Sequence, residues 1–513
     1  MRIRQRWQAG RQSMAPQKRQ TVLLTAGSAV LGLAVALTAV AASGPWDSGQ
    51  RTAERTWAAR QGDGSGTKHT GPGAGGPGSE LTAPQVLAEA GPVRGRESDG
   101  KRAGKGDGRH GESGGARADQ APAPTVSALA DTLEPLLRDG ALGSVRTASV
   151  VDAATGKELF STAPGTVATP ASTVKIATAV AALTARGEDH RIPTRVVADG
   201  DTVTLVGGGD PTLDEDGLTA LAEDTARKLR KSGTEKVTLR YDLSRYEGTD
   251  QHPIGPNENL APVVPLMLNE GRLDESEHGP ADRSGDPAGE AAEEFAKKLK
   301  AEDVEVEGAA EEKKAAKDAK RLAVHDSAPL GDLVERMLTH SDNDIAEALA
   351  RQTAIAEGEP ASFEGAEKAV ERRLDELGMP VKDARFADGS GLDRADRVSA
   401  GLLTRLLARA SDPDRTGLRP VLTGLPVAGF TGTLGGRYDS PREEPGAGLV
   451  RAKTGTLTGV NTLAGTVVDA DGRMLAFAFM TTGAPDRDRA QESLDELASA
   501  LANCGCRESP SGP

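Results

Sequence analysis

A long low-complexity stretch near the N-terminus limits where this chain can fold. Residues 44–122 consist mainly of Gly, Ser, Pro, Arg, Lys and Asp, as in GDGSGTKHTGPGAGGPGSE, with almost no apolar periodicity. Such a segment buries too little apolar surface to offset the conformational entropy lost on folding. We interpret residues 44–122 as a disordered tether, although a plain linker after a cleaved signal would have the same composition. Order is expected from Pro124 onwards.

The sequence before this tether is typical of membrane targeting. Basic residues recur through positions 1–20, and the uncharged run TVLLTAGSAVLGLAVALTAVAAS follows at residues 21–43. The run is long enough to span a bilayer, which favours a signal anchor with a basic cytoplasmic tail. Ala39-Val40-Ala41 also offers a small-residue cleavage site, so a signal peptide is the alternative. Either interpretation predicts an extracytoplasmic protein, anchored by one segment or secreted.

Charge, histidine and cysteine usage exclude several classes of function. The net charge is −14 and no basic patch follows residue 20, which argues against nucleic acid as a partner. The 7 histidines are scattered without an HExxH motif, so no metal or other cofactor is expected. Cys504 and Cys506 begin a C-terminal tail (504–513). Three interpretations of this pair stay open: a local disulfide, a weak metal-binding pair or two idle thiols.

The ordered sequence predicts an α+β fold in which both chain ends build one sheet. Residues 141–160 are typical of a hairpin, and residues 448–483 of three further strands before a last helix. An apolar helix starting at Ser172 should be buried and end before Gly187. We therefore assign residues 124–191 and 326–503 to one domain.

Residues 192–325 have an α/β pattern of their own and are interpreted as an inserted domain. A strand, a helix, a second strand and a second helix are expected there in turn. The charged stretch at residues 307–320 is expected to be a solvated face or a loop.

A candidate nucleophile motif begins the buried helix. Ser172 and Lys175 are three residues apart, so on a helix they share a face and the amine can reach the hydroxyl. To accept a proton, the Lys175 amine needs a pKa well below about 10.4, and burial or a second cation would lower it. The same Ser-x-x-Lys pattern begins at Ser65 and at Ser98, but both lie in the tether, where nothing holds the pair in register.

A second candidate motif, Ser341-Asp342-Asn343, falls in a break between helical segments. The Ser341 hydroxyl could relay a proton, and the Asn343 amide could bind a substrate amide. The tripeptide could equally be a helix N-cap formed by Asp342 or Asn343, which is compatible with catalysis. His340, next to Ser341, is expected to be structural rather than a base.

A third candidate motif, Lys453-Thr454-Gly455-Thr456, lies on a predicted strand. A cation and hydroxyls suit a substrate carboxylate, and the glycine lets a substrate backbone approach the strand. A similar tetrapeptide at residues 231–234 ends a predicted helix and is interpreted as its C-cap.

In this order the three motifs resemble the active-site set of the penicillin-recognising serine peptidases and β-lactamases. Further segments are similar to one branch, the class C low-molecular-mass penicillin-binding proteins, which are D-Ala-D-Ala carboxypeptidases and endopeptidases: VGGGDPTL (206–213), DGSGL (388–392) and LPVAGFTGTLGGR (425–437). The resemblance covers residues 124–503. It implies a serine β-lactamase/DD-peptidase-like fold, an antiparallel sheet flanked by helices plus a helical region, with an insert between the first two motifs. One departure is the lack of a tryptophan-bearing segment after Gly255-Pro256.

The resemblance implies catalytic roles for three residues. Ser172 would attack the penultimate D-Ala carbonyl, with Lys175 as general base. Ser341 would pass the proton to the departing D-Ala nitrogen. The substrates would be peptidoglycan stem peptides ending in D-Ala-D-Ala in the cell wall, and β-lactams would acylate Ser172 and remain attached.

The resemblance also implies a substrate-binding set. Asn343 would orient the acyl side of the substrate, while Lys453 supplies positive potential. Thr454 and Thr456 would bind the terminal carboxylate, with Gly455 between them. The backbone N–H groups of Ser172 and Thr456 would form the oxyanion hole.

Two other functions are weighed against this one. A β-lactamase of the same fold needs a glutamate that activates the deacylating water; Glu376 follows Ser341, but its helical pattern predicts a solvated face. A non-catalytic wall-binding or β-lactam-sensing module would have no need of Lys175, so the intact motifs argue against it.

Overall fold

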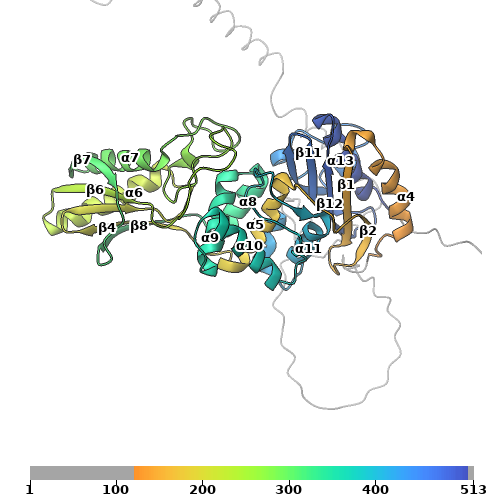
Figure 1. Cartoon of the computed structure of the whole chain (residues 1–513), viewed down its shortest axis with the longest axis horizontal. Coiled ribbons are helices and arrows are strands. Elements are labelled where there is room, and N and C mark those ends of the chain that lie inside the picture. Colours follow the sequence, from red (N-terminus) through yellow and green to blue (C-terminus); the bar gives the residue numbers. More distant parts are fainter. Residues whose placement is uncertain (1–120, 506–513) are drawn as a thin grey trace, which may run out of the picture. The chain divides into compact units, whose positions relative to one another are not determined.

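The computed structural model describes residues 121–505 (Figure 1). The predicted basic tail, the run at residues 21–43 and the tether up to residue 120 lie outside the described residues, as does Cys506. Within residues 121–505, no helix is both long and apolar enough to cross a membrane. Cys504 is buried against the core next to the last helix.

One five-stranded sheet combines strands from the two ends of the ordered chain, as predicted. Its antiparallel order is β10-β11-β12-β1-β2, and β1 lies beside β12 in Figure 1. The strands are β1 (Val145–Asp152), β2 (Glu158–Thr162), β10 (Val450–Leu457), β11 (Val460–Val468) and β12 (Met474–Thr482). The predicted hairpin is formed by β1 and β2. Strand β10 lies at an edge of this sheet, so one side of its backbone faces away from β11.

Helices cover both faces of this sheet because its central strands are apolar on both sides. All but the last residue of β11 is buried. One face packs on α4 (Val126–Leu137) and α13 (Arg487–Ala502). On the other face lies the helical region, made of α5 (Lys175–Arg186), α8 (Leu330–His340), α9 (Asn343–Glu357), α10 (Phe363–Glu376), α11 (Ala400–Ala410) and α12 (Arg419–Thr423).

Short elements complete this domain. A two-stranded sheet pairs β3 (Val167–Ala168) with β9 (Val398–Ser399). The 3₁₀ turns are η2 (Gly140–Leu142), η3 (Ala171–Val174), η4 (Asn269–Gly271), η5 (Thr416–Leu418), η6 (Gly432–Leu434) and η7 (Glu444–Gly446), of which η4 belongs to the insert.

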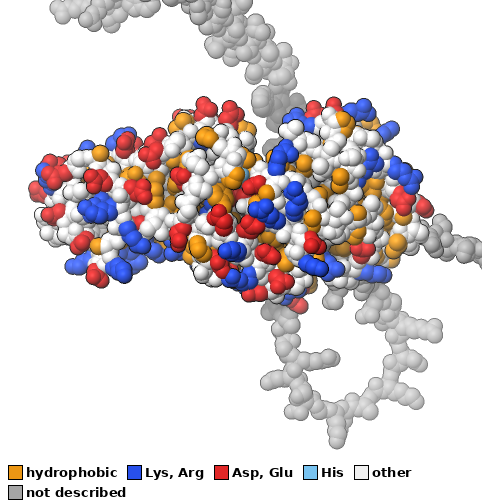
Figure 2. All heavy atoms as spheres, viewed as in Figure 1, with side chains coloured by type: hydrophobic (Ala, Val, Ile, Leu, Met, Phe, Trp, Pro, Cys, Tyr) orange, Lys and Arg blue, Asp and Glu red, His pale blue; other side chains and the backbone are white. Residues whose placement is uncertain are grey.

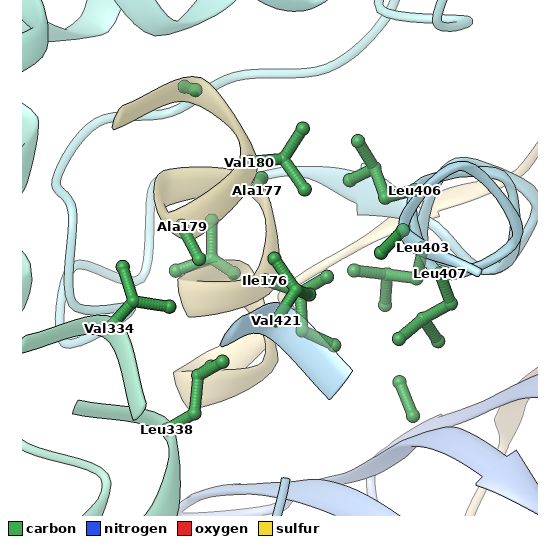
Figure 3. Packing of buried hydrophobic residues seen from close by; sticks show 14 of the residues in the cluster. Ile176, Ala177, Ala179, Val180, Val334, Leu338, Leu403, Leu406, Leu407 and Val421 are labelled. Atoms are coloured by element: carbon green, nitrogen blue, oxygen red, sulfur yellow. The ribbon is translucent and has the colours of Figure 1, made fainter. Parts of the chain in front are cut away.

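Helix α5 is buried among the other helices, as its apolar sequence predicts. Figure 3 shows Ile176 and Val180 of α5 among side chains of α8, α11 and α12. Gly187 ends the helix with a φ of 86°. The start differs from the prediction: Ser172 lies in the 3₁₀ turn η3, and the α-helix begins only at Lys175. Ala171, with a φ of 46°, directs the chain sharply into this turn.

The insert forms a second five-stranded sheet, in the order β7-β6-β5-β4-β8. The strands are β4 (Pro193–Asp199), β5 (Thr202–Val206), β6 (Lys236–Asp242), β7 (Glu305–Glu312) and β8 (Lys320–Asp326). Strand β6 pairs in parallel with both β5 and β7, whereas β4 pairs antiparallel with both β5 and β8. Its core is closed by α6 (Glu215–Ser232) and α7 (Pro287–Ala301). The predicted fold class, an α+β domain with an α/β insert, is confirmed.

The charged stretch at residues 307–320 is a solvated face followed by a loop, as expected, but its first part is a strand that was not predicted. Residues 307–312 complete strand β7, residues 313–319 form the loop and residue 320 begins β8. Strand β7 is an edge strand, bonded only to β6, and most of its side chains are exposed. An edge strand tolerates such charges because neither face needs to be apolar along its whole length. On the face in Figure 2, Lys and Arg side chains are interspersed with Asp and Glu rather than gathered into a basic surface.

Candidate active site

The three predicted motifs come together where turn η3 meets the open edge of β10. Gly455 makes this approach possible. A Cβ built on Gly455 would lie 2.7 Å from the Pro170 carbonyl oxygen and 3.1 Å from the Ser172 nitrogen. The Thr462 hydroxyl, on the neighbouring strand, donates to the same Pro170 oxygen at 2.8 Å. Absence of a side chain at Gly455 therefore sets how closely Ser172 lies to the strand.

Lys175 contacts both Ser172 and the second motif. Its Nζ lies 3.2 Å from Ser172 Oγ, 2.7 Å from Asn343 Oδ1 and 2.5 Å from the carbonyl oxygen of Ser390. The last two groups can only accept hydrogen bonds. A neutral Lys175 amine has two N–H groups and one lone pair, so these acceptors take both hydrogens and leave the lone pair for the Ser172 hydroxyl. The geometry is that of a general base beside a nucleophile.

The electrostatics of the site bring the neutral amine within reach near physiological pH. Lys175 is fully buried, and burial lowers its pKa to about 8, although Asp388, Asp342, Glu347 and Asp396 pull in the opposite direction. Lys453 is also fully buried, which places its pKa well below the usual value, and the nearby Lys175 cation lowers it further. Burial therefore lowers the pKa of Lys175 as predicted, whereas the effect of a second cation is seen on Lys453 rather than on Lys175.

The Ser-Asp-Asn motif forms the junction of α8 and α9. Ser341 ends α8 in the left-handed conformation (φ 60°). The Asp342 carboxylate caps α9 by accepting from the Ile345 N–H at 2.9 Å, so the capping interpretation holds for this residue. Asn343 is thereby held with Oδ1 towards Lys175. Ser341 is partly buried, and within residues 121–505 no hydrogen bond joins its hydroxyl to Ser172 or Lys175.

The third motif lies on β10, as predicted. Lys453 Nζ donates to the Thr454 carbonyl oxygen at 2.8 Å. The Thr454 hydroxyl donates to Thr433 Oγ1 at 2.9 Å, and Gln491 Nε2 donates to Thr456 Oγ1 at 3.1 Å. Thr433 and Gln491 were not identified from the sequence. The similar tetrapeptide at residues 231–234 instead ends α6, with Gly233 left-handed, as predicted.

The segment at residues 388–392 forms one wall of the site. In the sequence this segment is only a point of resemblance, yet its Ser390 carbonyl binds Lys175. Buried Glu347 on α9 holds this segment by accepting from the Gly389 and Ser390 N–H groups at 3.0 and 2.9 Å. The Gly-Ser-Gly sequence was the available signal, because such sequences favour irregular backbone with exposed amides.

The remaining sequence candidates lie where they were expected. Glu376 is on the surface at the end of α10, with 52% of its side chain exposed, and pairs with Arg373. The His340 ring stacks on His278 of the insert, with centroids 4.2 Å apart.

Two buried groups have the composition of metal ligands. One is made of His252, Glu347 and Asp388; the other of Glu270, Asp342 and Asp344. Both are balanced by protein cations or a histidine hydrogen bond, in the pairs His252–Asp388, Arg351–Glu347, Arg272–Glu270, Arg336–Glu270 and Arg283–Asp344.

Known proteins are similar to this chain in sequence and fold. The chain matches the D-Ala-D-Ala carboxypeptidase 3 (S13) family over residues 129–281 and 274–504. It is 37% identical to a carboxypeptidase of Mycobacterium tuberculosis over 407 residues, 76% of this chain and 87% of that protein. It is 36% identical to carboxypeptidase DacB of Mycolicibacterium smegmatis over 403 residues, 75% of this chain and 86% of the relative.

A solved structure has the same fold. The crystal structure of penicillin binding protein 4 from Haemophilus influenzae superposes with a TM-score of 0.59 at 23% identity, covering 73% of this chain and 98% of that one. At this identity the likeness concerns the fold alone.

Proposed function

Since the chain belongs to the D-Ala-D-Ala carboxypeptidase 3 (S13) family, it is a serine-type D-Ala-D-Ala carboxypeptidase, and we propose that it acts through an acyl-enzyme at Ser172. Its substrates are peptidoglycan stem peptides that end in D-Ala-D-Ala. The observation that carries the assignment of Ser172 is its contact with a buried Lys175 whose two other partners are acceptors.

Acylation begins with transfer of the Ser172 hydroxyl proton to the Lys175 amine. Ser172 Oγ then bonds to the penultimate D-Ala carbonyl carbon, and the carbonyl oxygen becomes an oxyanion. The N–H groups of Ser172 and Thr456 stabilise this charge; each such donor contributes about a hundredfold to a thousandfold in rate. The C–N bond then breaks, and the proton passes from Lys175 through Ser341 to the departing D-Ala nitrogen. Water releases the shortened peptide and regenerates Ser172.

The substrate is held by the second and third motifs. Asn343 orients the acyl side of the substrate, while Lys453 of β10 adds positive potential. Thr454 and Thr456 bind the terminal carboxylate, and their hydroxyls are oriented by Thr433 and Gln491. Gly455 leaves room for the substrate backbone beside β10.

β-Lactams acylate the same serine in this proposal. The carboxylate and amide of a β-lactam resemble those of D-Ala-D-Ala, but the leaving amine stays attached after ring opening. The acyl-enzyme should therefore persist, and Glu376 offers no substitute base because it lies exposed at the end of α10. Stoichiometric labelling by nitrocefin, rather than rapid turnover, is the expected behaviour.

We also propose an extracytoplasmic location, from the basic residues at 1–20 and the apolar run at 21–43. If the run is not cleaved, it anchors the enzyme to the membrane. Fractionation of the full chain, followed by N-terminal sequencing of the mature protein, tests both points.

Product analysis with muropeptides tests the reaction. Monomers and cross-linked dimers are incubated with the wild-type protein and with Ser172→Ala, and the products are weighed by mass spectrometry. Loss of one D-Ala from monomers supports the carboxypeptidase, and splitting of dimers would add an endopeptidase activity. Equal products from Ser172→Ala, or equal labelling of this variant by a fluorescent penicillin, would refute Ser172 as the nucleophile.

A further inference from the structure

A buried histidine of the insert contacts the wall of the active site. His252 Nε2 lies 2.9 Å from Asp388 Oδ2, and the side chains are 2% and 0% exposed. The His252 ring also packs edge-on against Phe363, with centroids 5.4 Å apart. This pair joins the insert to the segment that binds Lys175, although the two residues are distant in sequence.

Asp388 determines the shape of that segment. Its Oδ1 accepts from the Gly391 N–H at 2.5 Å, and its Oδ2 accepts from the Asp393 N–H at 2.7 Å and the Ser390 hydroxyl at 3.1 Å. The carboxylate is therefore the centre of a tight turn. The Ser390 carbonyl on this turn accepts from Lys175 Nζ at 2.5 Å.

We propose that His252 is a positioning residue for the general base Lys175, acting through Asp388 and the Ser390 carbonyl. The inference rests on the proposed function of Lys175. A continuous hydrogen-bonded path runs from the insert, through His252 and Asp388, to the backbone that holds the amine. The insert is thereby part of the catalytic apparatus rather than an independent addition.

The charge of His252 has a further effect on the base. Lys175 is faced by four acidic groups, Asp342, Glu347, Asp388 and Asp396, which raise its pKa against the larger lowering by burial. Three of the four have a neighbour that moderates their charge. Arg351 pairs with Glu347, burial and the charge of Asp388 raise the Asp396 pKa, and His252 pairs with Asp388.

The pKa of His252 is raised in this environment, although its Nδ1 accepts from the Ile254 N–H at 3.2 Å and a charged ring would lose that contact. Burial lowers its pKa, but the hydrogen bond to Asp388 and the charges of Glu347, Asp388 and Asp393 outweigh burial and raise it overall. Burial alone would raise the pKa of Asp388, yet the bonds from His252 and Gly391 lower it to about 2. Loss of the His252 charge would leave the Asp388 carboxylate unbalanced and favour the protonated, inactive form of Lys175.

The test compares the pH dependence of acylation among four proteins. His252→Gln keeps a hydrogen-bond donor without the charge, and Asp388→Asn removes the opposite charge. His325→Gln is the matched control, because His325 lies on β8 of the same insert, where a Cβ added at Gly217 of α6 would lie 2.7 Å from its ring. The second-order rate of labelling by a fluorescent penicillin is measured from about pH 5 to about pH 10 on the full chain.

The two substitutions should move the profile in opposite directions. One unit charge roughly 10 Å away at an effective dielectric of about 20 shifts a pKa by about one unit. The acid limb of the profile is the range in which the labelling rate falls as Lys175 becomes protonated. His252→Gln should therefore move this limb up by about one pH unit, and labelling below the limb should be about tenfold slower. Asp388→Asn should move the limb down. The control should keep the wild-type profile.

Unchanged limbs in both variants would overturn the inference while leaving the proposed function intact. A lower melting temperature with an unmoved limb would do the same, since it shows a purely structural contact. If His252→Gln does not fold, a downward shift in Asp388→Asn supports the charge coupling, and an unmoved limb overturns it. Failure of the wild-type protein and of the control to become labelled would instead refute the proposed function.

Discussion

Substitution of Gly455 by alanine should slow acylation because it separates Ser172 from strand β10. The new Cβ would lie 2.2 Å from Thr462 Oγ1 and 2.7 Å from the Pro170 oxygen. Carbon and oxygen do not approach below about 3 Å, so the strand and turn must separate by several tenths of an ångström, or Thr462 must rotate and lose its bond to Pro170. Overpacking of this kind costs about 1–3 kcal/mol in stability.

The rate should suffer more than the stability. In the proposed mechanism the oxyanion hole is shared between the Ser172 N–H and the Thr456 N–H, which lie on the two parts that alanine would separate. Misalignment of one donor is expected to reduce the rate by about a hundredfold.

Fluorescent-penicillin labelling and thermal unfolding measure the two effects on the same protein. Gly436→Ala is the matched control, because its Cβ would meet nothing within 4 Å. This variant should label like the wild type. A Gly455→Ala protein that is acylated at the wild-type rate would show that the close approach of η3 to β10 has no part in catalysis.

Three further outcomes follow from the site and its supports. The acylation rate should rise with pH up to about 8 and level off above, falling about tenfold per pH unit below, because only neutral Lys175 accepts the proton; a pH profile of labelling checks this. Arg437 donates two hydrogen bonds to the Asp495 carboxylate, at 2.6 and 2.7 Å, and the Asp495 side chain is only 3% exposed. Arg437→Ala should lower the free energy of unfolding by about 3–5 kcal/mol in urea titrations, because it leaves Asp495 as a buried unpaired charge. An effect below about 1 kcal/mol would contradict this. Glu376→Gln should leave the release rate of bound penicillin unchanged, and slower release would revive the β-lactamase interpretation.

Local sequence was sufficient for most of the framework. The apolar pattern of α5, the hairpin of β1 and β2 and the three C-terminal strands follow from apolar runs bounded by turn residues, which depend on neighbours a few positions away. Strand β7 was missed because this exposed edge strand carries no such apolar run. The turn η3 was interpreted as helix because Ser172 and Lys175 share a face in either geometry.

The motifs identified the chemistry, since nucleophile, base and carboxylate-binding groups need particular side chains whose spacing is visible in the chain. The partners that orient these groups could not be identified in this way. Thr433, Gln491 and His252 are separated in sequence from the residues they contact, and their residue types are common on any surface. The acceptor nearest to Lys175 is a backbone carbonyl, a group that every residue possesses. Its role depends wholly on where the folded chain places Ser390, and therefore on contacts that form only when the insert and the two chain ends pack together.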